Sequence, residues 1–138
     1  MTDRSHILIV EDDPLVVEVI VASLEADYRI SSVNTVGAAL AFLRTSHVDV
    51  VLIDKILPDG RGTEVACLAD NVGAAVVEMS GYPQEMDHLE HSAHLYLLKP
   101  FGIQALLSTI GNALHKVSGA AAGPTLDTEV TTSLEGAS

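Results

Sequence analysis

Residues 50–60 read VVLIDKILPDG, and this stretch decides the fold. An uninterrupted apolar run rich in β-branched side chains is typical of a strand that is buried on both faces, as in a parallel sheet. The run ends at Asp54, and the Pro58-Asp59-Gly60 that follows is typical of a turn. Asp54 is therefore predicted at the carboxyl end of a central strand, where open α/β sheets bind ligands. This position alone fits equally well a carboxylate that only caps a strand. The residues at the other strand ends decide between the two interpretations.

Strand and helix patterns alternate along the rest of the chain. Predicted strands cover residues 6–10, 28–33, 48–53, 74–79 and 94–98, and predicted helices cover about 14–26, 35–44, 63–69, 83–91 and 103–117. This alternation predicts an α/β fold with a doubly wound parallel sheet of five strands. Residues 118–138 contain no Lys or Arg and are rich in small and polar residues. They are predicted to form a flexible tail after a single domain over residues 1–117.

Length, charge and composition exclude several classes of function. The 138 residues suit one domain, and the net charge of -12, with only 7 Lys and Arg, leaves no basic face for nucleic acid. No apolar run is long enough to span a membrane, and there is no signal peptide, so a soluble cytoplasmic domain is expected. The single cysteine, Cys67, excludes an internal disulfide and is expected to pack in the core.

Functional side chains follow four of the predicted strands. They are Glu11 with Asp12, Asp54, Ser80 and Lys99. Because the carboxyl ends of parallel strands lie at one edge, three carboxylates would converge there, and they would repel one another unless a cation intervened. Mg²⁺ prefers such oxygens as ligands and binds phosphate oxygens at the same time. With a lysine and a hydroxyl alongside, the group favours formation of an aspartyl phosphate.

These residues resemble the receiver domain of two-component response regulators, of the stand-alone, single-domain type. The resemblance spans about residues 6–117 and is carried by Glu11-Asp12, Asp54 before Pro58 and Gly62, Ser80-Gly81 and Lys99-Pro100-Phe101. It implies a flavodoxin-like sheet with the strand order 2-1-3-4-5. It also implies that a sensor histidine kinase or a histidine phosphotransfer protein donates a phosphoryl group to Asp54, which then changes the contacts with an unknown downstream protein.

The resemblance implies a role for each matching residue. Asp54 would accept the phosphoryl group; Glu11, Asp12, Asp54 and the backbone carbonyl of Ile56 would bind Mg²⁺; Lys99 and Ser80 would contact the phosphoryl group; Ser80 and the aromatic Tyr96 would form the switch. Such a domain assists its own Mg²⁺-dependent phosphotransfer and dephosphorylation and is not otherwise an enzyme. Two alternatives stay open: a phosphate-independent binding module, and an aspartyl-phosphate phosphatase, which needs a second Asp where Ile56 stands.

Three features depart from the family pattern or add to it. Lys55 stands where the family more often has an apolar residue, and its side chain is expected to point to solvent. The predicted helix 83–91 lacks the basic residues that DNA-binding members use to dimerise, so no direct DNA binding is expected. His88, His91 and His94 recur every three residues, which fits a solvated helix face and the turn after it better than a metal site.

The predicted helix 14–26 is apolar nearly all round. Between Leu15 and Ala26 only Glu18, Ser23 and Glu25 are polar. A helix turns about 100° per residue, so these apolar side chains cannot all face the sheet. Some are expected to be exposed as a partner surface. The resemblance implies that the histidine-bearing phosphodonor docks on this helix.

Overall fold

The computed structural model describes residues 4–81 and 94–122, and its centre is one parallel sheet. The strands of this sheet are β1 (His6–Val10), β2 (Arg29–Val33), β3 (Val50–Asp54), β6 (Ala75–Ser80) and β7 (Leu95–Leu98). They lie in the order β2-β1-β3-β6-β7, and every neighbouring pair is parallel. Numbered by their order among these five, the strands run 2-1-3-4-5, which confirms the predicted doubly wound, flavodoxin-like sheet.

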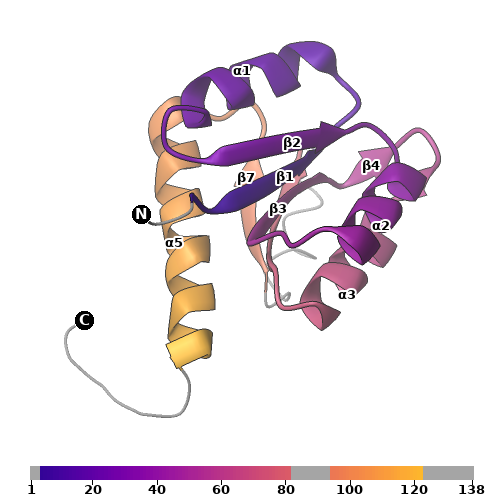
Figure 1. Ribbon diagram of the computed structural model, residues 1–138. Helices are drawn as coiled ribbons and strands as arrows, with labels where there is room; N and C mark the ends of the chain where they lie inside the picture. The colour runs from indigo at the N-terminus through magenta and orange to yellow at the C-terminus, as the bar shows by residue number, and fades with distance from the viewer. Residues whose placement is uncertain (1–3, 82–93, 123–138) are drawn as a thin grey trace.

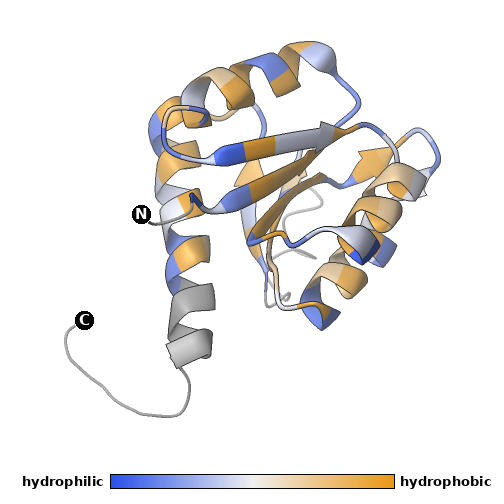
Figure 2. Cartoon of the chain, in the orientation of Figure 1, coloured by the Kyte–Doolittle hydropathy of each residue, from blue (hydrophilic) through white to orange (hydrophobic). Residues whose placement is uncertain are grey.

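Helices cover both faces of the sheet. One face carries α1 (Pro14–Leu24) and α5 (Ile103–Ala122), and the other carries α2 (Val36–Thr45) and α3 (Thr63–Asn71), as Figure 1 shows. The apolar strands lie between these layers, whereas the edge strand β2 is more polar (Figure 2). Side chains of β3 alternate between the two cores, with Val51 and Ile53 on the α2/α3 side and Val50 and Leu52 on the α1/α5 side.

Local sequence signals explain where α1 and α2 begin. The Asp13 side chain accepts a hydrogen bond from the Leu15 amide at 2.9 Å, and Pro14 is the first helical residue. Thr35 caps α2 in the same way, by accepting from the Ala38 amide at 3.1 Å. Asp13 is thus the N-cap of α1, as expected, and Glu11 and Asp12 at the end of β1 do not cap the helix.

The loop between β3 and α3 is more ordered than a simple turn. It contains an antiparallel hairpin of β4 (Ile56–Leu57) and β5 (Gly60–Arg61), with Gly60 at a φ of 144°. Asp59 accepts from the amides of Val36 and Gly37 at 2.8 and 3.1 Å, and these hydrogen bonds lower the pKa of its carboxyl. A Cβ on Gly62 would lie 2.9 Å from the Asp54 carbonyl oxygen, so this close approach requires glycine.

The structure differs from the sequence-based predictions at Cys67 and at the C-terminal end of α5. Cys67 is exposed on α3, so the prediction that it packs in the core was wrong. The helix α5 runs to Ala122, five residues into the segment predicted as a tail, and three of these five residues are alanines, which favour a helix. The predicted helix 83–91, with His88 and His91, lies outside the described residues. Among the described helices, none has the length and apolar character needed to cross a membrane.

Candidate functional site

Three carboxylates meet at the carboxyl edge of the sheet. Glu11 and Asp12 directly follow β1, and Asp54 is the last residue of β3, the neighbouring strand. Each of the three offers one carboxylate oxygen, and these oxygens lie within 4.8 Å of one another. Glu11 is buried and Asp12 is exposed, so the cluster runs from the protein interior to solvent. The strand-end prediction therefore holds for all three carboxylates.

Lys99 supplies the positive charge of the site. Its Nζ lies 2.7 Å from Glu11 Oε1 and 3.3 Å from Asp54 Oδ2, so one ammonium group bridges two of the carboxylates. A cis peptide bond joins Lys99 to Pro100, and the Lys99 amide donates to the Ser80 carbonyl oxygen at 2.7 Å. Burial alone would lower the pKa of Lys99, but the hydrogen bond to Glu11 and the charges of Asp54 and Glu11 raise it above its ordinary value.

Glu11 is the buried carboxyl group of the site. Burial raises the pKa of its carboxyl, the hydrogen bond from Lys99 opposes that rise, and the charge of Asp54 adds to it. Its second oxygen accepts from the Asp13 amide at 3.1 Å. Two carboxylates thus share one ammonium group, which leaves an excess of negative charge at this edge of the sheet.

The donor set fits Mg²⁺. Three carboxylate oxygens that converge from two strand ends, one of them exposed to solvent, are the hard ligands that this ion takes together with water and phosphate oxygens. Excess negative charge also favours a divalent cation, because the cation removes the repulsion among the carboxylates. Glu11, Asp12 and Asp54 are the residues that would hold it.

The remaining predicted site residues lie around this cluster. Ser80 is the buried last residue of β6, next to β3 in the sheet. Ile56 lies in β4, where its amide nitrogen is 3.5 Å from Asp54 Oδ1 and its side chain is exposed. Tyr96, in β7, is 37% exposed and pairs in register with Glu78. The aromatic ring therefore lies partly in solvent, on the sheet face opposite the core residues Leu95 and Leu97.

The sequence suggested that the Lys55 side chain points to solvent, and this prediction was wrong. Lys55 is buried, and its Nζ lies 3.3 Å from Glu78 Oε1. The other oxygen of Glu78 lies 2.7 Å from His94 Nδ1, and His94 Nε2 lies 2.8 Å from Asp70 Oδ2 on α3. We call these four residues the ion chain. The ion chain explains why Lys55 is buried, because a buried Glu in an apolar strand requires a cation.

The ion chain was missed in the sequence because its members are far apart there. One signal was available: Glu78 interrupts the apolar run of β6, Ala75–Ser80. A carboxylate in a strand covered on both faces must be paired, and the nearest cation that follows a neighbouring strand is Lys55. The position of His94 could not be found in this way, because it depends on how β7 lies beside β6.

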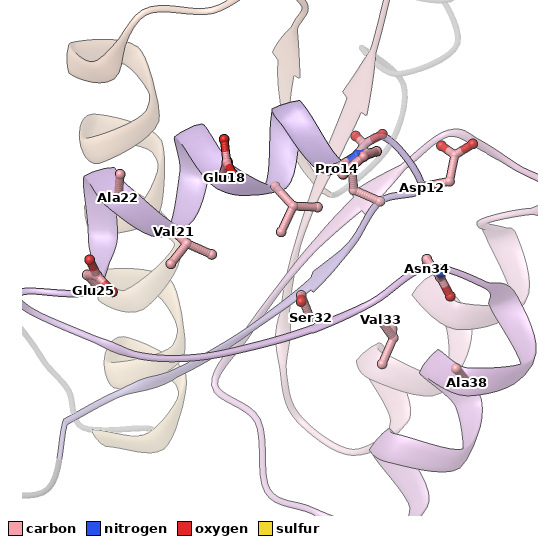
Figure 3. Close-up of a pocket in the computed structure, with 12 residues that line it drawn as sticks. Asp12, Pro14, Glu18, Val21, Ala22, Glu25, Ser32, Val33, Asn34 and Ala38 are labelled. Atoms are coloured by element: carbon pink, nitrogen blue, oxygen red, sulfur yellow. The ribbon is translucent and has the colours of Figure 1, made fainter.

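A groove runs beside the site, between α1 and the segment that joins β2 to α2 (Figure 3). Its volume is about 840 Å³. The lining residues are Glu11, Asp12, Pro14, Val17, Glu18, Val21, Ala22, Glu25, Ser32, Val33, Asn34 and Ala38. On α1 itself, Leu15 is 70% exposed and Val19 is 55% exposed, as expected for a helix with too many apolar residues to bury. The surface around the carboxylates therefore includes accessible apolar side chains.

Comparison with known proteins assigns the class of domain that this fold and site define. The family model of the response regulator receiver domain matches residues 7–111. The chain therefore belongs to the receiver-domain family of two-component response regulators. Within this family the domain is a phosphoacceptor switch, and the match covers both the sheet and the carboxylate edge.

Individual relatives agree with this assignment. The chain is 32% identical to the KDP operon transcriptional regulatory protein KdpE of Escherichia coli K12, over 83% of this chain and 53% of that protein. A CheY-like receiver domain from Methanospirillum hungatei JF-1 matches with a TM-score of 0.75 and 27% identity, over 84% of this chain and 98% of that one. The receiver domain of sensor histidine kinase PA1611 from Pseudomonas aeruginosa PAO1, with a magnesium ion in its active site cleft, has the same fold, with a TM-score of 0.69 and 23% identity over 81% of this chain and 98% of that one. The chain spans about half the length of KdpE.

Proposed function

We propose that this domain accepts a phosphoryl group on Asp54 from a histidine-bearing donor, a sensor histidine kinase or a phosphotransfer protein, and passes the signal on through protein contacts. The observation that supports this most directly is the convergence of three carboxylates with the Lys99 ammonium group at one sheet edge. The net charge of -12 supports signalling through proteins without direct contact to DNA by this domain.

The proposed chemistry uses the residues in separate roles. A carboxylate oxygen of Asp54 attacks phosphorus, a new P–O bond forms, and the bond between phosphorus and the donor atom breaks with its electron pair leaving on the donor. Lys99, now shared between Glu11 and Asp54, is within reach of a phosphoryl oxygen on Asp54. The hydroxyl of Ser80 is the proposed second contact, and the movement of Ser80 and Tyr96 toward it is the proposed switch.

Magnesium belongs to this proposal as the cofactor. Held by Glu11, Asp12, Asp54 and the Ile56 carbonyl, it would neutralise charge on the carboxylates and on the phosphoryl oxygens. Asp12, the exposed member, lies where the ion would enter, and Glu11 is fixed in place by Lys99 and the Asp13 amide. The protein thus supplies a preorganised acidic site.

The expected result of incubation with acetyl phosphate and Mg²⁺ is the gain of one phosphoryl group. A small-molecule donor needs no docking surface, so the reaction depends on the carboxylate edge alone. Intact-mass spectrometry measures the gain, and chelation of Mg²⁺ with EDTA should prevent it. If the protein gains no phosphoryl group in Mg²⁺, or gains it equally in EDTA, the proposed function is wrong.

The exposed apolar end of α1 is the proposed docking surface for the phosphodonor protein. Leu15 is 70% exposed in the first turn of α1, three residues after Asp12 in the chain. Leu15→Glu is expected to reduce transfer from a phosphorylated histidine phosphotransfer protein by about tenfold or more, because it places a charge in an apolar contact. Labelling by acetyl phosphate should stay unchanged. Val72→Glu, at the far end of α3 and 46% exposed, is the matched control. Equal loss with both donors would mean that Leu15 acts through the fold.

A further inference from the structure

The ion chain joins four segments of the fold behind the site. Asp70 comes from α3, Glu78 from β6, His94 precedes β7, and Lys55 follows β3. The side chains of Lys55 and Glu78 are only 10% and 11% exposed, and that of His94 is 19% exposed. Charges this poorly hydrated are costly unless each has a partner of opposite sign. The order Lys55, Glu78, His94, Asp70 alternates in sign only when His94 is an imidazolium.

The geometry at His94 requires that charge. Both ring nitrogens face carboxylate oxygens, Glu78 Oε2 at 2.7 Å and Asp70 Oδ2 at 2.8 Å. A neutral imidazole has one N–H donor and one acceptor nitrogen, so it could donate to only one of them. The other nitrogen would then face an oxygen lone pair. Loss of one proton from His94 therefore breaks one link of the ion chain.

The other end of the ion chain reaches the backbone of the site. Strand alternation turns Asp54 toward the α1/α5 side with Leu52, and Lys55 toward the α2/α3 side with Ile53. The charge of Lys55 thus points away from the carboxylates, while its backbone joins Asp54 directly to Ile56. Its amide donates to the Met79 carbonyl at 2.9 Å, and its carbonyl accepts from the Gly62 amide at 3.2 Å. Side chain and backbone together fix this residue at the edge of the site.

We propose that the ion chain is a positioning device for residues 55–57, which makes phosphoryl transfer to Asp54 depend on the protonation of His94. This inference rests on the proposed function of Asp54, and it assigns to Lys55, Glu78 and His94 an indirect part in it. None of the three is proposed to touch the phosphoryl group. They hold the segment that follows Asp54 and carries the Ile56 carbonyl.

The direction of the pH dependence follows from the groups that face His94. Among the described residues these are Glu78 on β6 and Asp70 on α3, with Lys55 beyond Glu78. Burial alone would lower the pKa of His94, but the hydrogen bonds to the two carboxylates raise it above its ordinary value. A raised pKa in the folded state stabilises the fold below the unfolded-state value, and this contribution is lost as pH rises through the folded-state value. The ion chain is therefore intact at mildly acid pH and broken at alkaline pH.

The first test is made without metal or phosphate. In NMR titrations from about pH 6 to about pH 9, the amide resonance of Ile56 should move with the same midpoint as the His94 ring. In His94→Gln this movement should disappear. His47→Gln is the matched control, because His47 pairs with Asp49 at 3.0 Å but its side chain is 79% exposed. An Ile56 resonance that ignores the titration of His94 would overturn the inference.

The second test measures phosphorylation by acetyl phosphate as the ratio of variant to wild type at each pH, so that the chemistry of the donor cancels. His94→Gln and Lys55→Met should be about three- to tenfold slower than wild type at pH 6 and should approach it near pH 9. The loss should appear as a higher Mg²⁺ concentration for half-maximal rate, because the Ile56 carbonyl is misplaced. A variant that is only partly folded would lose maximal rate at an unchanged Mg²⁺ requirement.

The double variant Lys55→Met/Glu78→Leu separates charge from folding. Replacing a buried pair by apolar side chains is often neutral for stability, and His94 keeps its contact with Asp70, so this protein should still unfold cooperatively. It should nevertheless show no dependence of its rate on the protonation of His94. If the ratio of the double variant's rate to the wild-type rate stays constant with pH, the inference about the ion chain is wrong but the proposed function stands. If the wild type is not labelled at any pH, the proposed function itself is wrong.

Discussion

Asp54→Asn is expected to abolish phosphorylation by acetyl phosphate. The amide is close to the carboxylate in size, so the fold is kept, but it lacks the negative oxygen that attacks phosphorus. Intact-mass spectrometry of the variant in Mg²⁺ should show no gain. Asp27→Asn is a suitable control, since Asp27 is exposed and precedes β2, at the opposite edge of the sheet, and this variant should be labelled like wild type.

The same substitution should stabilise the protein in the absence of Mg²⁺. Asp54 is repelled by Glu11 and Asp12, whose carboxylate oxygens lie within 4.8 Å of its own, and it is attracted by Lys99, whose Nζ lies 3.3 Å from Asp54 Oδ2 but is shared with Glu11. Removing its charge should therefore raise the free energy of unfolding, by about 1 kcal/mol in a partly solvated site. Added Mg²⁺ should stabilise wild type more than the variant, because the ion loses one ligand. A variant less stable than wild type in EDTA would show that the three carboxylates are not in net repulsion.

Leu52→Ala is expected to have the largest effect on stability. Leu52 is 0% exposed in the middle of β3, and it packs against core residues of α1 and the neighbouring strands. Removing its side chain atoms leaves a cavity between rigid elements, at a cost of about 2–5 kcal/mol. That is a large part of the stability of an ordinary domain. Urea unfolding followed by far-UV circular dichroism is suitable, because the chain has no tryptophan.

Leu15→Ala is the chemically identical control for Leu52→Ala. Leu15 is 70% exposed at the start of α1, so its truncation should change the free energy of unfolding by no more than about 0.5 kcal/mol. Similar losses for the two leucines would contradict the assignment of Leu52 to the core and of Leu15 to the surface. The comparison also supports the docking test, since it establishes that changes at Leu15 do not act through stability.

The sequence was sufficient for the sheet and the carboxylate edge because both rest on short-range patterns. Apolar runs that end in functional groups place Glu11, Asp12, Asp54 and Lys99 at one edge once the strands are parallel, and the structure brings all four together. The Asp13 cap is equally local. The exposed fraction of α1 could also be anticipated, because helix geometry leaves no room to bury every apolar side chain.

Features that depend on side chains from distant segments could not be predicted. From the sequence, Lys55 follows a strand and is expected in solvent. Its buried position depends on the ion pair with Glu78 on β6. His94 fitted a solvated turn, yet it is held between Glu78 and Asp70. Cys67 has an apolar character but falls on the exposed side of α3. In each case the sequence gives the residue type, and the neighbours that decide its environment come from tertiary packing.

The most direct test of the central claim is to locate the phosphoryl group. After labelling with acetyl phosphate in Mg²⁺, treatment with borohydride reduces an acyl phosphate to an alcohol with release of phosphate, which converts a phosphorylated aspartate to homoserine. Peptide mass spectrometry then reads the position of the homoserine. Homoserine is expected at position 54, and Asp12 should be unchanged. Homoserine at position 12, or labelled protein with Asp54 intact, would contradict the proposed role of Asp54.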